Sequence, residues 1–177
     1  LYGVDFSTAQ LNTAKGVTSY LSTPIHFIES PMEDMIELPE AYFDIAVSIY
    51  ALGWTVNLDK TLKNVYDSLK SGGVFIFSWE HPVHSVLEYD EEKLFFRRSY
   101  VDEGPEKHES WRSVPIIMNY RKISTYINAL VKAGFIIDQV VEETRIPEND
   151  NSKPSKWYSA EKARIICPDI IIKSHKL

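Results

Sequence analysis

Short strand-like runs alternate with segments of helical periodicity along most of the 177 residues. The run Phe43–Ile49 has the β-branched density of a central strand, and the stripe from Leu58 to Leu69 repeats apolar residues three or four apart. The glycine pair at 72–73 then ends that helix and leads into a strand at Val74–Trp79. This alternation predicts an α/β protein with a doubly wound, mostly parallel sheet.

Capping residues predict where two of the helices begin and end. Ser7 follows an opening strand that closes on Asp5, and Gln10 completes a capping box three residues later. Farther along, Ser124 is the expected N-cap of a helix that Gly134 stops.

The second half of the chain carries an insertion and a different strand arrangement. From 82 to 119 the periodicity fails while aromatic and charged residues intermingle, so we expect a lid or binding loop, or a small satellite core. Two last strands are expected at Phe135–Val141 and about 165–173, joined by a polar loop at 147–156 and no helix. Such a connection predicts an antiparallel pair at the edge of the sheet.

Composition limits the classes of partner and compartment. With 25 acidic and 19 basic residues the net charge is −6, which disfavours nucleic acid as a partner. The single cysteine, Cys167, precludes an internal disulfide and is expected to be a buried, inert thiol, so the cytoplasm is the default compartment. No apolar run has the length of a membrane span, and the length of the chain predicts one domain. The oligomeric state is not indicated.

Several short motifs occur in a characteristic order. They are the strand, acid and helix cap at Tyr2–Ser7, the pairs Leu38-Pro39 and Phe43-Asp44, the turn Leu69–Gly73, and the ending Cys167–Lys173. Together they resemble the class I, seven-stranded S-adenosylmethionine-dependent methyltransferases, in particular the group that acts on small molecules. The resemblance covers nearly the whole chain.

The resemblance implies S-adenosylmethionine as the cofactor, S-adenosylhomocysteine as the product and a small molecule as the methyl acceptor. Asp5 stands where a carboxylate accepts both ribose hydroxyls, as in dinucleotide-binding folds. Met32 lies in the loop that contacts adenine, where Pro31 replaces the acid that the family often has. The cofactor-binding residues implied in this way are Asp5, Phe6, Met32, Glu33, Ser48 and Ile49.

Two further residues are candidates for the catalytic site. Tyr50 follows the strand at 43–49 and could offer its ring to a cation, or could pack beneath the next helix. His81 follows the strand at 74–79 and is the candidate general base, needed only if the acceptor carries a proton; the alternative is a structural role in holding the next loop. No metal site is expected, because Pro82 should prevent a helix that would bring His81 and His84 together.

The family's glycine-rich first strand has no counterpart before Asp5. We therefore expect roughly 40 to 60 further residues upstream of Leu1, the size of a strand and helix unit, and a gap at the centre of the sheet without them. Two other functions stay open: a nicotinamide-dependent oxidoreductase, which also places an acid on a ribose, and a non-catalytic methyltransferase-like binding module, which the departures at Pro31 and Ser71 would suit.

Overall fold

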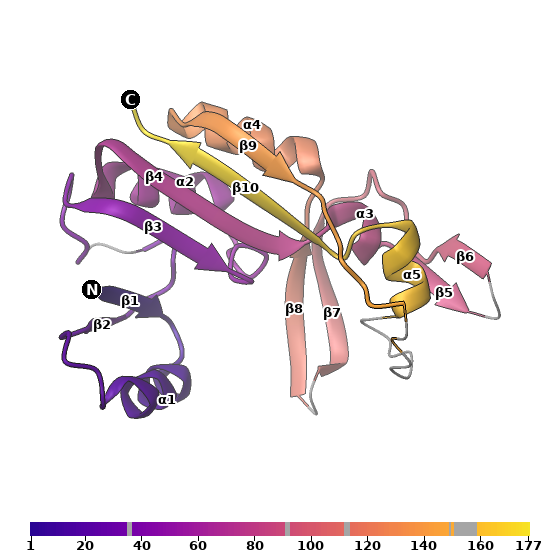
Figure 1. Cartoon of the computed structure of the whole chain (residues 1–177), viewed down its shortest axis with the longest axis horizontal. Helices are drawn as coiled ribbons and strands as arrows, with labels where there is room; N and C mark the ends of the chain where they lie inside the picture. The colour runs from indigo at the N-terminus through magenta and orange to yellow at the C-terminus, as the bar shows by residue number, and fades with distance from the viewer. Residues whose placement is uncertain (35–36, 91–92, 112–113, 149, 151–158) are drawn as a thin grey trace.

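The computed structural model describes residues 1–34, 37–90, 93–111, 114–148, 150 and 159–177. Strands and helices alternate along the first half, and hairpins interrupt the order in the second half (Figure 1). In chain order the elements are β1 (Tyr2–Asp5), α1 (Thr8–Thr18), β2 (His26–Glu29), β3 (Phe43–Ile49), α2 (Leu58–Ser68), β4 (Leu69–Glu80), α3 (Pro82–Ser85), β5 (Leu87–Asp90), β6 (Lys93–Phe96), β7 (Gly104–Trp111), β8 (Val114–Tyr120), α4 (Ile123–Ala133), β9 (Ile136–Val141), α5 (Ala160–Ile165) and β10 (Asp169–His175).

The main sheet has four strands in the order β3-β4-β10-β9. β3 runs parallel to β4, whereas β10 runs antiparallel to both β4 and β9. A separate parallel pair, β1 and β2, carries α1 and lies beside β3 without pairing to it in the described part of the chain (Figure 1). The predicted α/β class with a mixed sheet is confirmed.

The C-terminal strands differ from expectation in their connection. β9 and β10 form an antiparallel pair at one edge of the sheet, as predicted, with β10 also paired to β4, but α5 lies between them along the chain. The predicted absence of a helix is wrong because six residues, capped by Ser159, are too short to show a clear helical stripe. The predicted polar loop at 147–156 lies partly outside the described residues.

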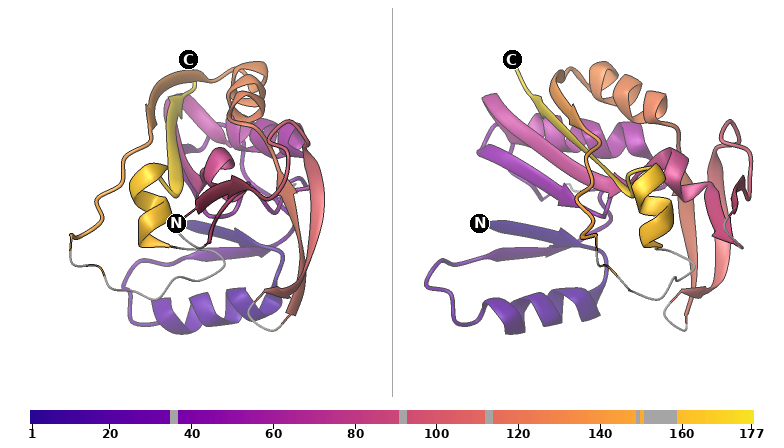
Figure 2. Two further views of the ribbon diagram at one scale, coloured as in Figure 1. Left: turned by 90° about the vertical axis from the view of Figure 1, so that its right-hand side faces the viewer. Right: turned by 45° about the vertical axis from the view of Figure 1, so that its right-hand side comes forward.

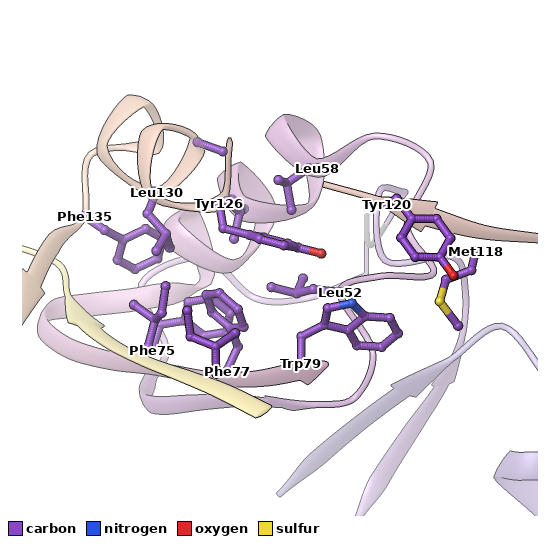
Figure 3. Close-up of a cluster of buried hydrophobic side chains, with 14 of the residues drawn as sticks. Leu52, Leu58, Phe75, Phe77, Trp79, Met118, Tyr120, Tyr126, Leu130 and Phe135 are labelled. Carbon is purple, nitrogen blue, oxygen red and sulfur yellow. The ribbon is translucent and has the colours of Figure 1, made fainter. Parts of the chain in front are cut away.

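The hydrophobic core fills the space between one face of the sheet and helices α2 and α4 (Figure 3). Phe75, Phe77 and Trp79 alternate along β4 toward this core and are at most 6% exposed. On β3, by contrast, Ile45, Val47 and Ile49 are 62%, 58% and 71% exposed. The edge of the four-stranded sheet nearest β1 is therefore apolar and uncovered.

The helix ends agree with the sequence at two positions and disagree at two. Ser7 caps α1 by accepting from the Gln10 amide, and Gly134 ends α4 in the left-handed conformation with φ 104°. The predicted helix end at the glycine pair 72–73 is wrong, because α2 ends at Ser68 and Gly72, with φ 76°, lies inside β4. Ser124 is likewise not an N-cap, because α4 begins one residue before it.

The early start of α4 has a physical cause in the insertion. The amide of Lys122 donates to Glu103 Oε1 at 2.7 Å, and the amide of Ile123 donates to the Tyr100 hydroxyl at 3.1 Å. Residues distant in sequence thus satisfy the first amides of the helix, which makes a local side-chain cap unnecessary.

The insertion is ordered into a short helix and two hairpins. Pro82 occupies the first turn of α3, so it begins a helix where it was expected to prevent one. β5 pairs with β6, and β7 pairs with β8 in a longer hairpin that projects from the carboxyl end of β4 (Figure 2). We call residues 82–120 the lid. None of the helices in the described part of the chain reaches the length and apolarity needed to span a bilayer.

Candidate functional site

A cavity of about 620 Å³ opens between β1 and β3 and continues past their carboxyl ends. Its volume is in the range of small-molecule and cofactor sites. Four of the six residues predicted to bind the cofactor line it, namely Asp5, Met32, Ser48 and Ile49. Phe6 is 68% exposed, and neither it nor Glu33 is among the lining residues.

Asp5 ends β1 and is held by the loop that follows. One carboxylate oxygen accepts the amide of Ser7 at 2.8 Å, and the Asp5 carbonyl accepts the amide of Ser30 at 3.1 Å. The carboxylate retains further lone pairs for a ligand in the cavity. A carboxylate fixed in this way at a strand end suits a vicinal diol.

The loop after β2 is attached to the rest of the site by two contacts. The Met32 carbonyl accepts the side-chain amide of Asn64 at 3.0 Å, and Glu33 Oε2 accepts the hydroxyl of Thr55 at 3.1 Å. Thr55 is itself buried and lies 2.7 Å from the Thr61 hydroxyl. Met32 therefore faces the cavity from an anchored loop, while Glu33 contributes to the anchoring.

Polar and strained groups gather where β3 ends. Ser48 Oγ is buried and has no hydrogen-bond partner among the described residues, although it lines the cavity. Tyr50 has φ 51°, a left-handed conformation that is uncommon for a residue with a bulky side chain. Unpartnered polar atoms and backbone strain of this kind concentrate at ligand sites.

Tyr50, Trp54 and Trp79 form an aromatic cluster at the ends of β3 and β4. The Trp79 ring lies 5.9 Å from that of Tyr50 and 5.8 Å from that of Trp54. Tyr50 remains 47% exposed, whereas Trp79 is 6% exposed. Tyr50 thus contacts Trp79 of β4 while almost half of the residue stays exposed, and its role toward a cation stays a prediction.

His81 is the N-cap of α3. Its Nδ1 accepts from the amides of Val83 at 3.2 Å and His84 at 3.3 Å, so Nε2 carries the proton and donates to Glu142 at 2.8 Å. The side chain is 3% exposed and lines a different cavity from Asp5. These contacts favour the structural role, and a role as general base stays a prediction.

His84 is a buried histidine on the same short helix. It is 1% exposed, and neither ring nitrogen has a hydrogen-bond partner in the part of the chain that is described; Glu80 lies 3.6 Å from Nδ1, too far for a hydrogen bond. Burial lowers the pKa of His84, as does the nearby charge of Lys162, and Glu80 opposes the shift only in part. His84 is therefore neutral in the folded state at pH 7.

Neutral burial of His84 predicts that the protein loses stability in acid. The unfolded chain takes up a proton near the ordinary histidine pKa of about 6.5, while the folded chain resists protonation until a lower pH. We expect the free energy of unfolding to fall as the pH drops below about 6.5, and His84→Phe to reduce that fall. Urea titrations at several pH values measure it. The exposed control His26→Phe should keep the fall, and an unchanged slope in His84→Phe would contradict the prediction.

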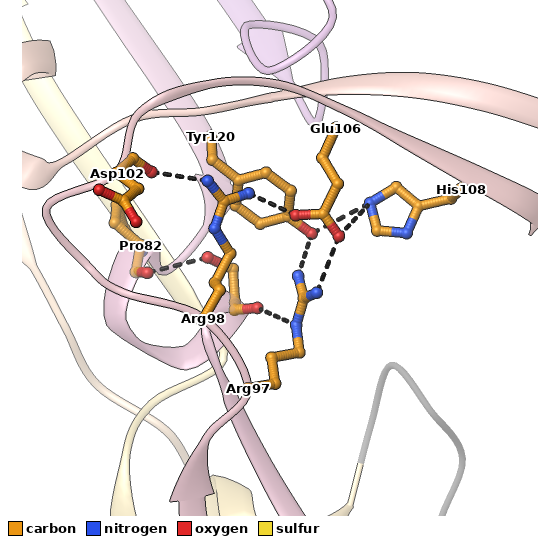
Figure 4. A network of polar contacts seen from close by, with 8 residues as sticks. Pro82, Arg97, Arg98, Asp102, Glu106, His108 and Tyr120 are labelled. Atoms are coloured by element: carbon orange, nitrogen blue, oxygen red, sulfur yellow. Dashed lines mark hydrogen bonds and ion pairs between the residues drawn. The ribbon is translucent and has the colours of Figure 1, made fainter.

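Within the lid, two arginines lie against the ring of Tyr120 (Figure 4). The guanidinium carbons of Arg97 and Arg98 lie 5.2 and 4.3 Å from the ring centroid, and Glu106 accepts hydrogen bonds from both side chains. Arg97 also donates to the Tyr120 hydroxyl, which lies 3.1 Å from His108 Nε2. Burial would raise the pKa of Glu106, but the hydrogen bond from Arg97 and the two positive charges lower it below its ordinary value.

Two buried tyrosines should respond differently to the loss of their hydroxyls. Burial raises the pKa of both to about 12, but Tyr120 bonds Arg97 and His108, whereas the Tyr126 hydroxyl has no hydrogen-bond partner within the described ranges. We expect Tyr120→Phe to lower the free energy of unfolding by about 1–3 kcal/mol and Tyr126→Phe to leave it unchanged or raise it. Parallel denaturant titrations of the two variants provide the measurement, and equal losses would contradict it.

Some residues of the site have weak signals in the sequence. Gly53 is one, since a Cβ there would lie 1.7 Å from Trp79, a contact that no local pattern reveals. Glu80 is another, because the sequence around it does not indicate that it lines a cavity. Among the described residues, no group of three His, Cys, Asp or Glu side chains could hold a metal ion. Cys167 is partly buried, and burial raises the pKa of its thiol.

An acid ends β1, Met32 lies in the loop after β2, and the last strand of the main sheet is reversed. Residues 1–77 match the family model described as a methyltransferase domain. The fold is similar to that of a candidate S-adenosylmethionine-dependent methyltransferase from Listeria monocytogenes, with a TM-score of 0.77 and 27% identity over 99% of this chain and 79% of that one.

Two curated relatives are also similar in sequence. An uncharacterized protein of Haemophilus influenzae is 31% identical over 120 residues, which are 63% of this chain and 47% of that protein. Saccharomyces cerevisiae CRG1, named as a probable S-adenosylmethionine-dependent methyltransferase, is 26% identical over 121 residues, 67% of this chain and 41% of that protein. The chain spans less than half the length of either curated relative.

The family match over residues 1–77 and the similar fold support the class I S-adenosylmethionine-dependent methyltransferases as the class that this chain resembles. S-adenosylmethionine is the cofactor of this class. The predicted resemblance to this class is confirmed at that level. The family match favours this class over the nicotinamide-dependent oxidoreductases.

Proposed function

We propose that this protein binds S-adenosylmethionine in the cavity between β1 and β3 and transfers its methyl group to a small-molecule acceptor. The observation that carries the proposal is the presence in one cavity of the Asp5 carboxylate, Met32 and the unpartnered hydroxyl of Ser48. An orphaned buried hydroxyl needs a partner, and a polar ligand in the cavity would supply one.

The residues fit the parts of the nucleoside in separate ways. Asp5 would accept hydrogen bonds from the ribose hydroxyls, and the side chain of Met32 would pack against the adenine. When bound, the cofactor supplies a methyl group on positively charged sulfur, which is already activated for in-line displacement. The protein then has to align the acceptor and exclude water, and the aromatic cluster of Tyr50, Trp54 and Trp79 is suited to both tasks.

We also propose that a further parallel strand, ending in a glycine-rich turn, fills the slot between β1 and β3. β1 is parallel to its neighbour β2, β3 is parallel to its neighbour β4, and the facing edges have no strand partner among the described residues. Edges with free backbone groups and exposed apolar side chains require a partner. The turn of such a strand would hold the methionine part of the cofactor.

The test compares cofactor binding and methyl transfer in the full-length protein. Isothermal titration calorimetry should detect binding of S-adenosylhomocysteine and show no competition from NAD, and a labelled methyl group should reach an acceptor in a panel of small molecules. Binding of NAD in preference would support the oxidoreductase. Binding of S-adenosylhomocysteine without transfer to any acceptor would support the non-catalytic module. No binding of S-adenosylhomocysteine would overturn the proposal.

A further inference from the structure

A second, much smaller cavity lies under the lid at the carboxyl end of β4. It has about 10 Å³ and is lined by Trp79, Glu80, Asn119, Tyr120 and others from the lid. That volume is enough for about one water molecule or one polar group of a ligand. The Trp79 ring lines the small cavity and also contacts Tyr50. Tyr50 directly follows Ile49, which lines the proposed cofactor cavity. The small cavity is therefore next to the place where the methyl group would be transferred.

The polar groups around this cavity are not fully used. The Glu80 side chain is 18% exposed, and its nearest ion-pair contact is the 3.6 Å approach to His84. Asn119, which also lines the cavity, is 9% exposed. His84, which approaches Glu80 but does not line the cavity, is 1% exposed with both ring nitrogens unpartnered among the described residues. Buried groups of this kind cost stability unless a ligand or water satisfies them.

The neighbouring cations are engaged elsewhere. Lys162, 6% exposed, donates to the Leu87 carbonyl at 2.6 Å, and Arg97 donates to Glu106 at 2.9 Å. Arg121, which lines the cavity, donates to the carbonyls of Leu52 at 3.2 Å and Thr55 at 2.5 Å. None of the three forms a salt bridge with Glu80 among the described residues. The Glu80 carboxylate thus remains a hydrogen-bond acceptor without a cationic donor within hydrogen-bonding distance.

We propose that Glu80 determines acceptor specificity by accepting a hydrogen bond from an N–H or O–H group of the acceptor, an amine or a hydroxyl, in the small cavity beside Trp79. This inference rests on the proposed function. A carboxylate group on the acceptor would meet the Glu80 carboxylate and be excluded. The aromatic cluster packs against the apolar body of the acceptor.

The experiment uses the full-length protein saturated with S-adenosylhomocysteine and three probes of similar shape: 2-phenylethylamine, 2-phenylethanol and 3-phenylpropionate. We expect a thermal shift with the amine or the alcohol and none with the acid. Glu80→Gln should weaken that binding at least tenfold while leaving the affinity for S-adenosylhomocysteine unchanged. Glu109→Gln, an exposed carboxylate of the lid, is the matched control and should bind like the wild type.

The outcomes separate this inference from the proposed function. Failure of the wild type to bind S-adenosylhomocysteine would refute the proposed function itself. Normal S-adenosylhomocysteine binding combined with a response to the acid, or with no response to amine and alcohol at millimolar concentration, would refute only the role of Glu80. An unchanged response in Glu80→Gln would refute it as well, and the comparison of amine with alcohol identifies which donor is preferred.

Discussion

Asp5→Ala is expected to weaken binding of S-adenosylhomocysteine to the full-length protein by about 100-fold or more. The Asp5 carboxylate lines the proposed cofactor cavity at the end of β1 and is held there by the amide of Ser7. Each hydrogen bond to a charged group contributes about 1.5–3 kcal/mol, so the loss of two bonds to a ribose amounts to two or more factors of ten in Kd. Calorimetric titration gives the affinity directly.

The matched control for this experiment is Asp44→Ala. Asp44 lies near the opposite end of β3, is 80% exposed and forms a surface ion pair with Lys70. Surface pairs of this kind contribute little, so both affinity and stability should stay near the wild-type values. Equal affinities for Asp5→Ala and the wild type would show that the ribose site was misplaced.

The sequence predicted the elements with strong periodicity. The run Phe43–Ile49 became β3 with the predicted bounds, and the stripe from Leu58 became α2 with its apolar side against the sheet. The capping signals at Ser7 and Gly134 were also confirmed. Each of these features depends on residues close in sequence, which is why a local pattern predicts it.

The errors occur where distant residues decide the local structure. Ser124 was assigned as an N-cap, but Glu103 and Tyr100 of the lid satisfy the first amides of α4. The antiparallel pair β9 and β10 lies at the edge as predicted, but the helix α5 between its strands was not predicted. The hairpins of the lid have mixed aromatic and charged sequences, so their pairing depends on cross-strand partners more than on alternation.

In the candidate site, too, some features were predicted from the sequence and others depend on residues distant in sequence. The resemblance placed Asp5, Met32, Ser48 and Ile49, and these four line one cavity. The resemblance did not predict that Thr55 anchors Glu33 by a hydrogen bond between two loops, because the two residues lie 22 positions apart. The tautomer of His81 likewise depends on Glu142, which lies 61 residues away. Long-range contacts therefore decide which polar side chains remain available to a ligand.

Gly53→Ala is expected to lower the free energy of unfolding by about 3 kcal/mol or more. A Cβ at this position would lie 1.7 Å from Cζ2 of Trp79, and the buried Trp79 ring, 6% exposed, has little room to move. For a domain of this size the melting temperature should fall by roughly 6 to 12 °C. Because Trp79 also contacts Tyr50, the displacement should alter the aromatic cluster. Differential scanning calorimetry measures the effect.

Two further variants make this prediction specific. Gly16→Ala lies within α1 with no atom within 4 Å of its Cβ, so it should raise stability by about 0.5–1 kcal/mol. In Gly53→Ala/Trp79→Leu the smaller side chain relieves the clash, so the double variant should lose less stability than the sum of the two single losses. Additive losses would mean that the Trp79 ring does not pack on the Gly53 backbone. The Trp79 ring would then not lie between the small cavity and the proposed cofactor cavity.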